Sequence, residues 1–154
     1  MHSEADLEAT KLVNLVGVAM TDEKEVKIET TKQTASLRQI IAAITHLHKK
    51  ELECAITLAG AAEGQLPEST GEYLFRLLKR VASHDELNLV RDWLKHPSGP
   101  DKATITEFEA ALMISRAIHK FVSVYKASHP QFETFSEWVV AAGHMPRPLT
   151  QRAK

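Results

Sequence analysis

The sequence predicts an all-α fold, a single-domain bundle of about five helices. Apolar residues recur three and four positions apart along most of the chain, a spacing that places them on one face of a helix. Glycine and proline are scarce, with six of each, and nearly all of them fall between or outside the periodic segments, where helices are expected to end. The length of 154 residues is typical of one domain and is sufficient to bury a hydrophobic core.

We expect three parts along the chain. An N-terminal arm covers residues 1–33, a helical bundle covers residues 34–143, and a flexible tail covers residues 144–154. Apolar residues between Leu7 and Val16 could line one side of a short helix within the arm. The apolar and charged residues that alternate after it have the period of a strand. Because no second strand is predicted to pair with them, we expect an extended linker there.

Two helices open the bundle. The apolar stripe of the first consists of Leu37, Ile40, Ile41, Ile44 and Leu47. The polar segment 46–50 interrupts the pattern, which resumes at Leu52 and ends near Gly64. Small residues are concentrated over 60–64, and small residues one turn apart let another helix approach closely. That helix could come from the same chain or from a second copy.

Two shorter helices are expected next. The first covers 73–81, and the second includes Leu87, Val90 and Trp93. Pro97 ends the second, because the residue before a proline is pushed out of the helical conformation.

Two more helices complete the bundle. Thr106 and Glu109 have the spacing of a capping box, which starts a long helix. Pro130 suits the first turn of the last helix, and Gly143 suits its end. The expected core positions of the two helices are Ile105, Phe108, Leu112, Ile118, Phe121, Val122 and Tyr125, and then Phe132, Phe135, Trp138 and Val139.

Charge and cysteine content narrow the classes of function. Nineteen basic and 20 acidic residues give a net charge of −1, which argues against coating nucleic acid or membranes by bulk charge, although a local basic patch stays open. The single cysteine, Cys54, excludes an intrachain disulfide and fits a reducing cytosol. No apolar run approaches the roughly 20 residues that cross a bilayer, so we expect a cytoplasmic protein without a membrane partner.

The eight histidines raise the question of a metal site. His46 and His48 would point roughly 200° apart on one helix and could not chelate together, and the other histidines lack ligand spacing. Cys54 lies among apolar residues and is expected to be a buried structural thiol. We therefore predict no metal and no cofactor.

The segment Arg91–His96 combines groups that can act on a phosphate. On a regular helix Arg91 and His96 would lie about 140° apart, but Pro97 lets His96 leave the helix and share a site with Arg91. An arginine can hold a phosphate and a histidine can transfer protons near neutral pH, which are the two roles that metal-free RNA cleavage requires. A purely structural role is the alternative, since cations stabilise the last turn of a helix and Arg91 could pair with Glu86 or Asp92.

The same segment resembles the signature of HEPN (higher eukaryote and prokaryote nucleotide-binding) domains, in which an arginine, usually followed by a polar residue, precedes a histidine by a few positions. Asp92 occupies the polar position here. The segments 58–63 and 113–118 provide a context similar to that of a group of small bacterial HEPN-like proteins, so that the likeness extends over roughly residues 34–126.

The resemblance implies a helical bundle that dimerises so that two such motifs meet. Catalytic members of the family are metal-independent endoribonucleases, and others are nucleotide-binding or interaction modules. By this likeness Arg91 would bind the scissile phosphate, His96 would act as general acid or base, and Asp92 would orient one of them. Glu63 corresponds loosely to an acidic residue that some members use.

Three further cations could belong to a phosphate-binding surface. Lys95 adjoins the motif, and Arg116 and Lys120 lie four positions apart on one helix face, where an ordinary solvated surface is the alternative. The sequence thus predicts a protein that binds RNA or a nucleotide and could cleave RNA without metal. The alternative is a non-catalytic dimeric protein that interacts with a protein partner. The near-zero charge provides no wide basic surface and counts against efficient cleavage.

Overall fold

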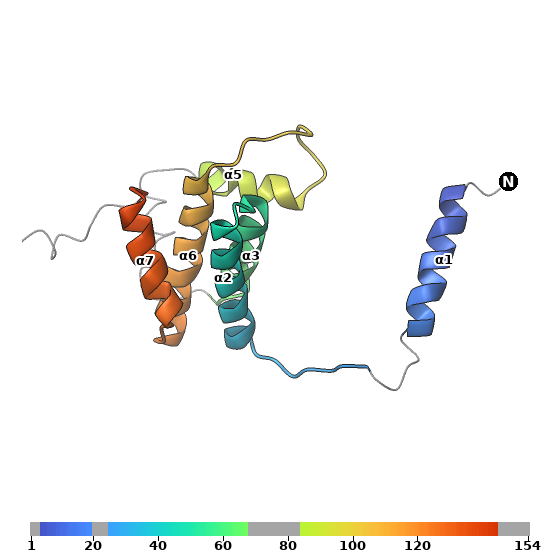
Figure 1. Cartoon of the computed structure of the whole chain (residues 1–154), viewed down its shortest axis with the longest axis horizontal. Coiled ribbons are helices and arrows are strands. Elements are labelled where there is room, and N and C mark those ends of the chain that lie inside the picture. The colour runs from blue at the N-terminus through green and yellow to red at the C-terminus, as the bar shows by residue number, and fades with distance from the viewer. Residues whose placement is uncertain (1–3, 20–24, 68–83, 145–154) are drawn as a thin grey trace, which may run out of the picture. The chain divides into compact units, whose positions relative to one another are not determined.

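The computed structural model describes residues 4–19, 25–67 and 84–144, which contain six helices and no strand (Figure 1). This confirms the all-α prediction. The helix expected over 73–81 lies outside the described residues. None of the described helices is long and apolar enough to span a membrane. The helices are α1 (Glu4–Ala19), α2 (Lys32–His48), α3 (Leu52–Gly64), α5 (His84–Lys95), α6 (Glu107–Tyr125) and α7 (Pro130–Ala141).

The chain divides into two compact units, residues 1–30 and residues 31–154. In the first unit α1 is followed by residues 25–30, which form neither helix nor strand. The second unit begins where Thr31 caps α2, its Oγ1 accepting a hydrogen bond from the backbone N–H of Thr34 at 3.0 Å. This cap places the start of the bundle a few residues before the boundary that the sequence predicts.

The core of the second unit lies between α2, α3 and α6. Figure 1 shows α2, α3, α6 and α7 running alongside one another, with α5 at one end of the group. Alanines at the contacts among α2, α3 and α6 allow a close approach of the helices, and larger side chains fill the spaces around them. The buried residues include Ala43, Ala55, Ala59, Ala62, Ala110, Ala111 and Ala117, together with Ile40, Leu47, Ile56, Ile114, Phe121, Phe132, Phe135 and Val139.

The buried face of α6 is rotated from the predicted one. Phe108 and Val122 were expected in the core, yet they are 47% and 37% exposed. The face toward α2 and α3 instead carries small residues and Ile114. The prediction was wrong at these two positions because it followed the largest apolar side chains, whereas close packing against the alanines of α3 favours the small side of α6. At Phe121 it is confirmed, since that residue is 2% exposed.

The ends of the helices follow local chemistry. The predicted capping box is present, with the Glu109 N–H donating to Thr106 Oγ1 at 3.2 Å and the Thr106 N–H donating to Glu109 Oε2 at 2.7 Å. Pro130 occupies the first turn of α7. Gly143 follows its end at a φ of 81°, which favours glycine. These predictions of helix ends are confirmed.

A surface ion cluster makes the stability of the bundle depend on pH. Glu107 accepts hydrogen bonds from Lys50 Nζ at 2.6 Å and from His144 Nε2 at 3.0 Å. These two hydrogen bonds, led by that of Lys50, lower the pKa of Glu107. A lowered carboxyl pKa stabilises the fold above the unfolded pKa of about 4.3, and the contribution is lost as the pH falls through the folded value.

Glu107→Gln is therefore expected to lower the melting temperature at pH 7 and to have progressively less effect as the pH falls below about 4. Thermal denaturation from neutral to acidic pH measures this difference. The control variant Glu133→Gln, which alters an exposed carboxylate on α7, should leave the pH profile of wild type unchanged. A Glu107→Gln effect of the same size at all pH values would contradict the assignment.

Candidate phosphate site at the end of α5

The position of Arg91 depends on a glycine in the neighbouring helix. A Cβ atom on Gly60 of α3 would lie 3.0 Å from Cδ and 3.1 Å from Cγ of Arg91. The aliphatic stem of Arg91 thus packs directly over the bare backbone of α3. The sequence left open which helix approaches the small residues of 60–64, and at Gly60 it is α5 of the same chain.

The guanidinium of Arg91 is held at the protein surface by its neighbour in sequence. Its Nη2 and Nε donate to the same oxygen of Asp92, Oδ1, at 3.2 and 3.3 Å. The side chain of Arg91 is 17% exposed and that of Asp92 is 45% exposed. Arg91 therefore has little freedom, whereas the more exposed carboxylate can turn away when an anion competes for the guanidinium.

His96 is the first residue after α5, as Pro97 led us to expect. Its backbone N–H still donates to the carbonyl oxygen of Asp92 at 3.2 Å, and the residue is exposed, as is Lys95. The following loop is tied to the helix because Trp93 Nε1 donates to the carbonyl oxygen of Pro100 at 2.8 Å. The end of α5 thus carries two exposed cationic or titratable residues, Lys95 and His96, one turn after the anchored Arg91 in the sequence.

Glu63 and two of the predicted phosphate-binding cations form a separate, buried cluster. Glu63, Arg116 and Lys120 are 4%, 0% and 6% exposed. Arg116 Nη2 donates to Glu63 Oε1 at 2.8 Å and to Asn88 Oδ1 at 3.0 Å. Lys120 Nζ donates to the backbone carbonyl oxygen of Glu63 at 3.1 Å, where a cation is favoured by the dipole at the end of α3.

These contacts correct the prediction of a wider phosphate-binding surface. Arg116 and Lys120 share a face of α6, but that face is buried. Arg116 binds the Glu63 carboxylate and Lys120 binds the Glu63 backbone carbonyl, so neither cation faces solvent. Between them on the helix, His119 is an exposed residue, and its partial desolvation lowers its pKa. Of the predicted additional cations, Lys95 is the one that is exposed.

The buried cluster and Arg91 belong to the same contact between α3 and α5. Asn88 and Arg91 are one turn apart on α5, and their neighbours Glu63 and Gly60 are one turn apart on α3. Glu63 reaches Asn88 through Arg116. It can therefore position α5, and with it the end that carries His96, without touching the motif itself.

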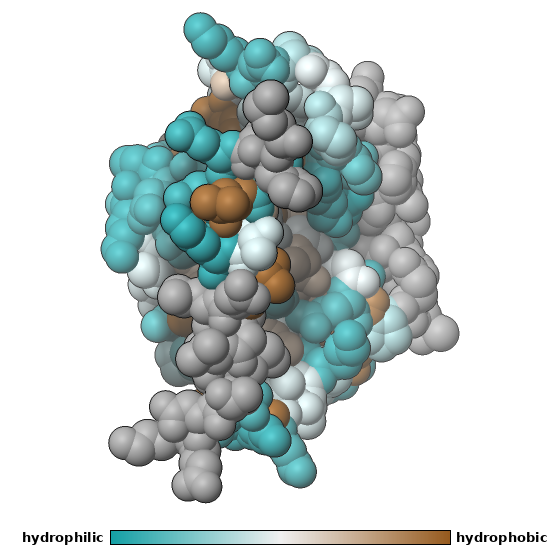
Figure 2. Space-filling view, turned by 90° about the vertical axis from the view of Figure 1, so that its right-hand side faces the viewer, coloured by the Kyte–Doolittle hydropathy of each residue, from teal (hydrophilic) through white to brown (hydrophobic). Residues whose placement is uncertain are grey.

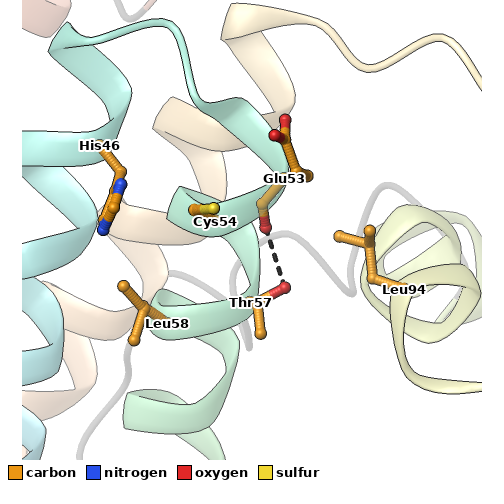
Figure 3. A pocket seen from close by; sticks show the side chains of 6 residues that line it. All are labelled: His46, Glu53, Cys54, Thr57, Leu58 and Leu94. Atoms are coloured by element: carbon orange, nitrogen blue, oxygen red, sulfur yellow. Dashed lines mark hydrogen bonds between the residues drawn. The ribbon is translucent and has the colours of Figure 1, made fainter.

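A pocket between α2, α3 and α5 is a feature that the sequence did not predict. Its volume is about 280 Å³, and it is lined by His46, Glu53, Cys54, Thr57, Leu58 and Leu94 (Figure 3). Cys54, expected to be a buried structural thiol, is half-buried at this pocket. The signal available in the sequence was the spacing of His46, Glu51 and Cys54 across the break between two predicted helices.

On the face seen in Figure 2, the residues that are coloured by hydropathy form no broad apolar area. Hydrophilic residues predominate there, and hydrophobic residues form separate small patches.

No model of a known protein family, no curated protein and no solved structure matches the chain.

Proposed function

We propose that the chain is a HEPN-like protein that binds RNA phosphate at the end of α5 and cleaves RNA without a metal ion. The observation that supports this is the anchored guanidinium of Arg91 on the helix whose end carries the exposed residues Lys95 and His96. A guanidinium restrained by packing and by one exposed carboxylate is already placed for a phosphate, which lowers the entropy lost on binding.

The proposed reaction is an internal transesterification. His96 takes the proton of the ribose 2′-hydroxyl, and the 2′-oxygen forms a bond to phosphorus while the bond to the 5′-oxygen of the next nucleotide breaks. Arg91 and Lys95 balance the charge that develops on the phosphoryl oxygens. The leaving 5′-oxygen takes a proton from a protonated histidine, which His96 of a second copy would supply in a dimer. The products are a 2′,3′-cyclic phosphate and a 5′-hydroxyl.

His96→Ala is expected to slow cleavage about 10²–10⁴-fold, the range that general acid–base catalysis contributes. The assay uses the purified full chain, single-stranded RNA labelled at its 5′ end, and a chelator throughout. His48→Ala removes an exposed histidine of α2 and should cleave as wild type does. No cleavage by wild type, or equal cleavage by His96→Ala, would refute the nuclease.

A non-catalytic dimeric protein is the second candidate, and the Arg91–Asp92 ion pair is the observation that favours it. An arginine already paired within its own helix can serve structure alone. Such a protein would act in the cytoplasm through a protein partner and would not cleave RNA. Arg91→Ala and His96→Ala would then leave its dimeric state, measured by light scattering, unchanged, and each would lower the melting temperature by a few degrees, as a loss of about 1 kcal/mol does.

A further inference from the structure

The junction between α2 and α3 brings the end of one helix close to the start of the next. After α2 ends at His48, Lys50 adopts a φ of 65°. The backbone N–H of Glu51 then donates to the carbonyl oxygen of His46 at 3.0 Å. Glu51 directly precedes α3, and Cys54 lies in its first turn. This backbone geometry places three side chains of different chemistry on one side of the junction.

The three side chains offer a set of metal ligands. Within the part of the chain that the structure describes, one ligand atom each of His46, Glu51 and Cys54 lies within 4.8 Å of the other two. His46 Nδ1 and Glu51 Oε1 are 3.3 Å apart. In a tetrahedral zinc site, nitrogen and oxygen ligands at about 2.0–2.1 Å from the ion lie about 3.3 Å from each other, and a thiolate at about 2.3 Å lies about 3.6 Å from either.

We propose that His46, Glu51 and Cys54 bind a Zn²⁺ ion through Nδ1, a carboxylate oxygen and Sγ. The observed spacing of His46 and Glu51 suits two neighbouring ligands, and a rotation of the Cys54 side chain brings its sulfur to the ion. A mixed nitrogen, oxygen and thiolate set is typical of zinc. Two negative ligands neutralise the charge of the ion, which favours binding at a half-buried position.

The fourth coordination position opens to the pocket. His46 and Cys54 both line it, together with Glu53, Thr57, Leu58 and Leu94 (Figure 3). Three protein ligands with an open fourth position are the arrangement of zinc sites that bind water or a small ligand. The side chains of His46 and Glu51 are 31% and 45% exposed, so an ion can enter from solvent.

Lys50, the residue directly before Glu51, does not compete with a metal ion for the Glu51 carboxylate. The Nζ of Lys50 binds Glu107 of α6 at 2.6 Å, so this cation is directed to a carboxylate other than Glu51. Glu51 therefore keeps its carboxylate for His46 and for the proposed ion. Glu51 thus pairs with His46, and Glu107 of α6 pairs with Lys50.

Cobalt substitution of the full chain tests the site directly. Co²⁺ takes up tetrahedral zinc sites and gives visible d–d bands and, with a thiolate ligand, a charge-transfer band in the near ultraviolet. Because Cys54 is the only cysteine of the chain, such a band reports this residue alone. We expect one Co²⁺ per chain with both features, and displacement of Co²⁺ by an equivalent of Zn²⁺.

Variants separate ligands from neighbours. Cys54→Ser is expected to abolish the charge-transfer band, and His46→Ala and Glu51→Gln are each expected to weaken Zn²⁺ binding at least about tenfold. His48→Ala and Glu133→Gln alter an exposed histidine and an exposed carboxylate outside the site, and both variants should bind as wild type does. Circular dichroism is used to check that each variant is helical. If Cys54→Ser fails to fold, Glu51→Gln still tests the site, because it changes an exposed group.

Two outcomes would overturn the site. Wild type that takes up no stoichiometric Co²⁺ or Zn²⁺ would leave His46 and Glu51 as an ordinary hydrogen-bonded pair. Binding that survives in His46→Ala and Cys54→Ser at the strength of wild type would place the ion elsewhere. The result is independent of the nuclease proposal, because RNA cleavage is measured with chelator present and metal binding is measured without RNA.

Discussion

Glu63→Ala is expected to destabilise the bundle by about 3–5 kcal/mol, the cost of leaving a buried charge without its partner. Arg116 is fully buried, and its Nη2 atom is 2.8 Å from Glu63 Oε1. Asn88 also accepts from that nitrogen, but a neutral amide does not replace a carboxylate. Urea denaturation followed by circular dichroism gives the free energy of unfolding of the variant and of wild type.

Glu53→Ala is the matched control, because Glu53 is an exposed carboxylate on the same helix. Its effect should stay within about 0.5 kcal/mol. Replacing both Glu63 and Arg116 with methionine should recover much of the loss, since apolar residues of similar volume can substitute for a buried ion pair. Equal stability of Glu63→Ala and Glu53→Ala would show that the pair does not stabilise the fold.

Phe121→Ala is expected to cost a similar amount, about 3–5 kcal/mol, through the loss of buried surface and the cavity that remains. Phe121 is 2% exposed. Its ring centroid lies 5.0 Å from that of Tyr125 and 5.7 Å from that of Phe132, the latter in an edge-on contact that joins α6 to α7. The expected fall in melting temperature is roughly 10 °C.

Phe108→Ala removes the same side chain from the same helix at a position that is 47% exposed. We expect a loss below about 1 kcal/mol there, because little buried surface disappears. The pair of variants tests the rotation of α6 that the structure revealed. If Phe108→Ala were as damaging as Phe121→Ala, both phenylalanines would be buried, as the sequence predicts.

The two stability predictions and the two proposals also concern different parts of the bundle. Glu63 and Phe121 act through the core between α3, α6 and α7, whereas His96 and the metal ligands lie at helix ends. Loss of RNA cleavage in Glu63→Ala would accordingly be accompanied by loss of stability. Loss of RNA cleavage in His96→Ala should occur with the fold intact, since His96 is exposed.

Helix ends were the most predictable features of the chain. The capping box of Thr106 and Glu109, the proline at the start of α7 and the proline that follows α5 act within a few residues, so their effect can be read from local order. The sequence also predicted that some helix would approach Gly60 closely, because a glycine has no side chain to keep a neighbouring helix away. Its partner, Arg91, depended on the path of α5.

Burial of charge was the least predictable feature. Arg116 and Lys120 have the spacing of an exposed basic face, and their sequence neighbours do not distinguish that face from a buried one. Glu63, 53 residues before Arg116 in the chain, supplies the charge that makes burial of Arg116 feasible. Such a pairing exists only after α3 and α6 have packed.

The sequence by itself determined that this protein is helical and where most of its described helices begin and end. These properties follow from hydrophobic period, caps and local order, which act over a few residues. The tertiary structure alone decided which face of α6 is buried, that Arg91 packs on Gly60, and that His46, Glu51 and Cys54 meet at one junction. Each of these depends on how a turn or a neighbouring helix directs side chains in space.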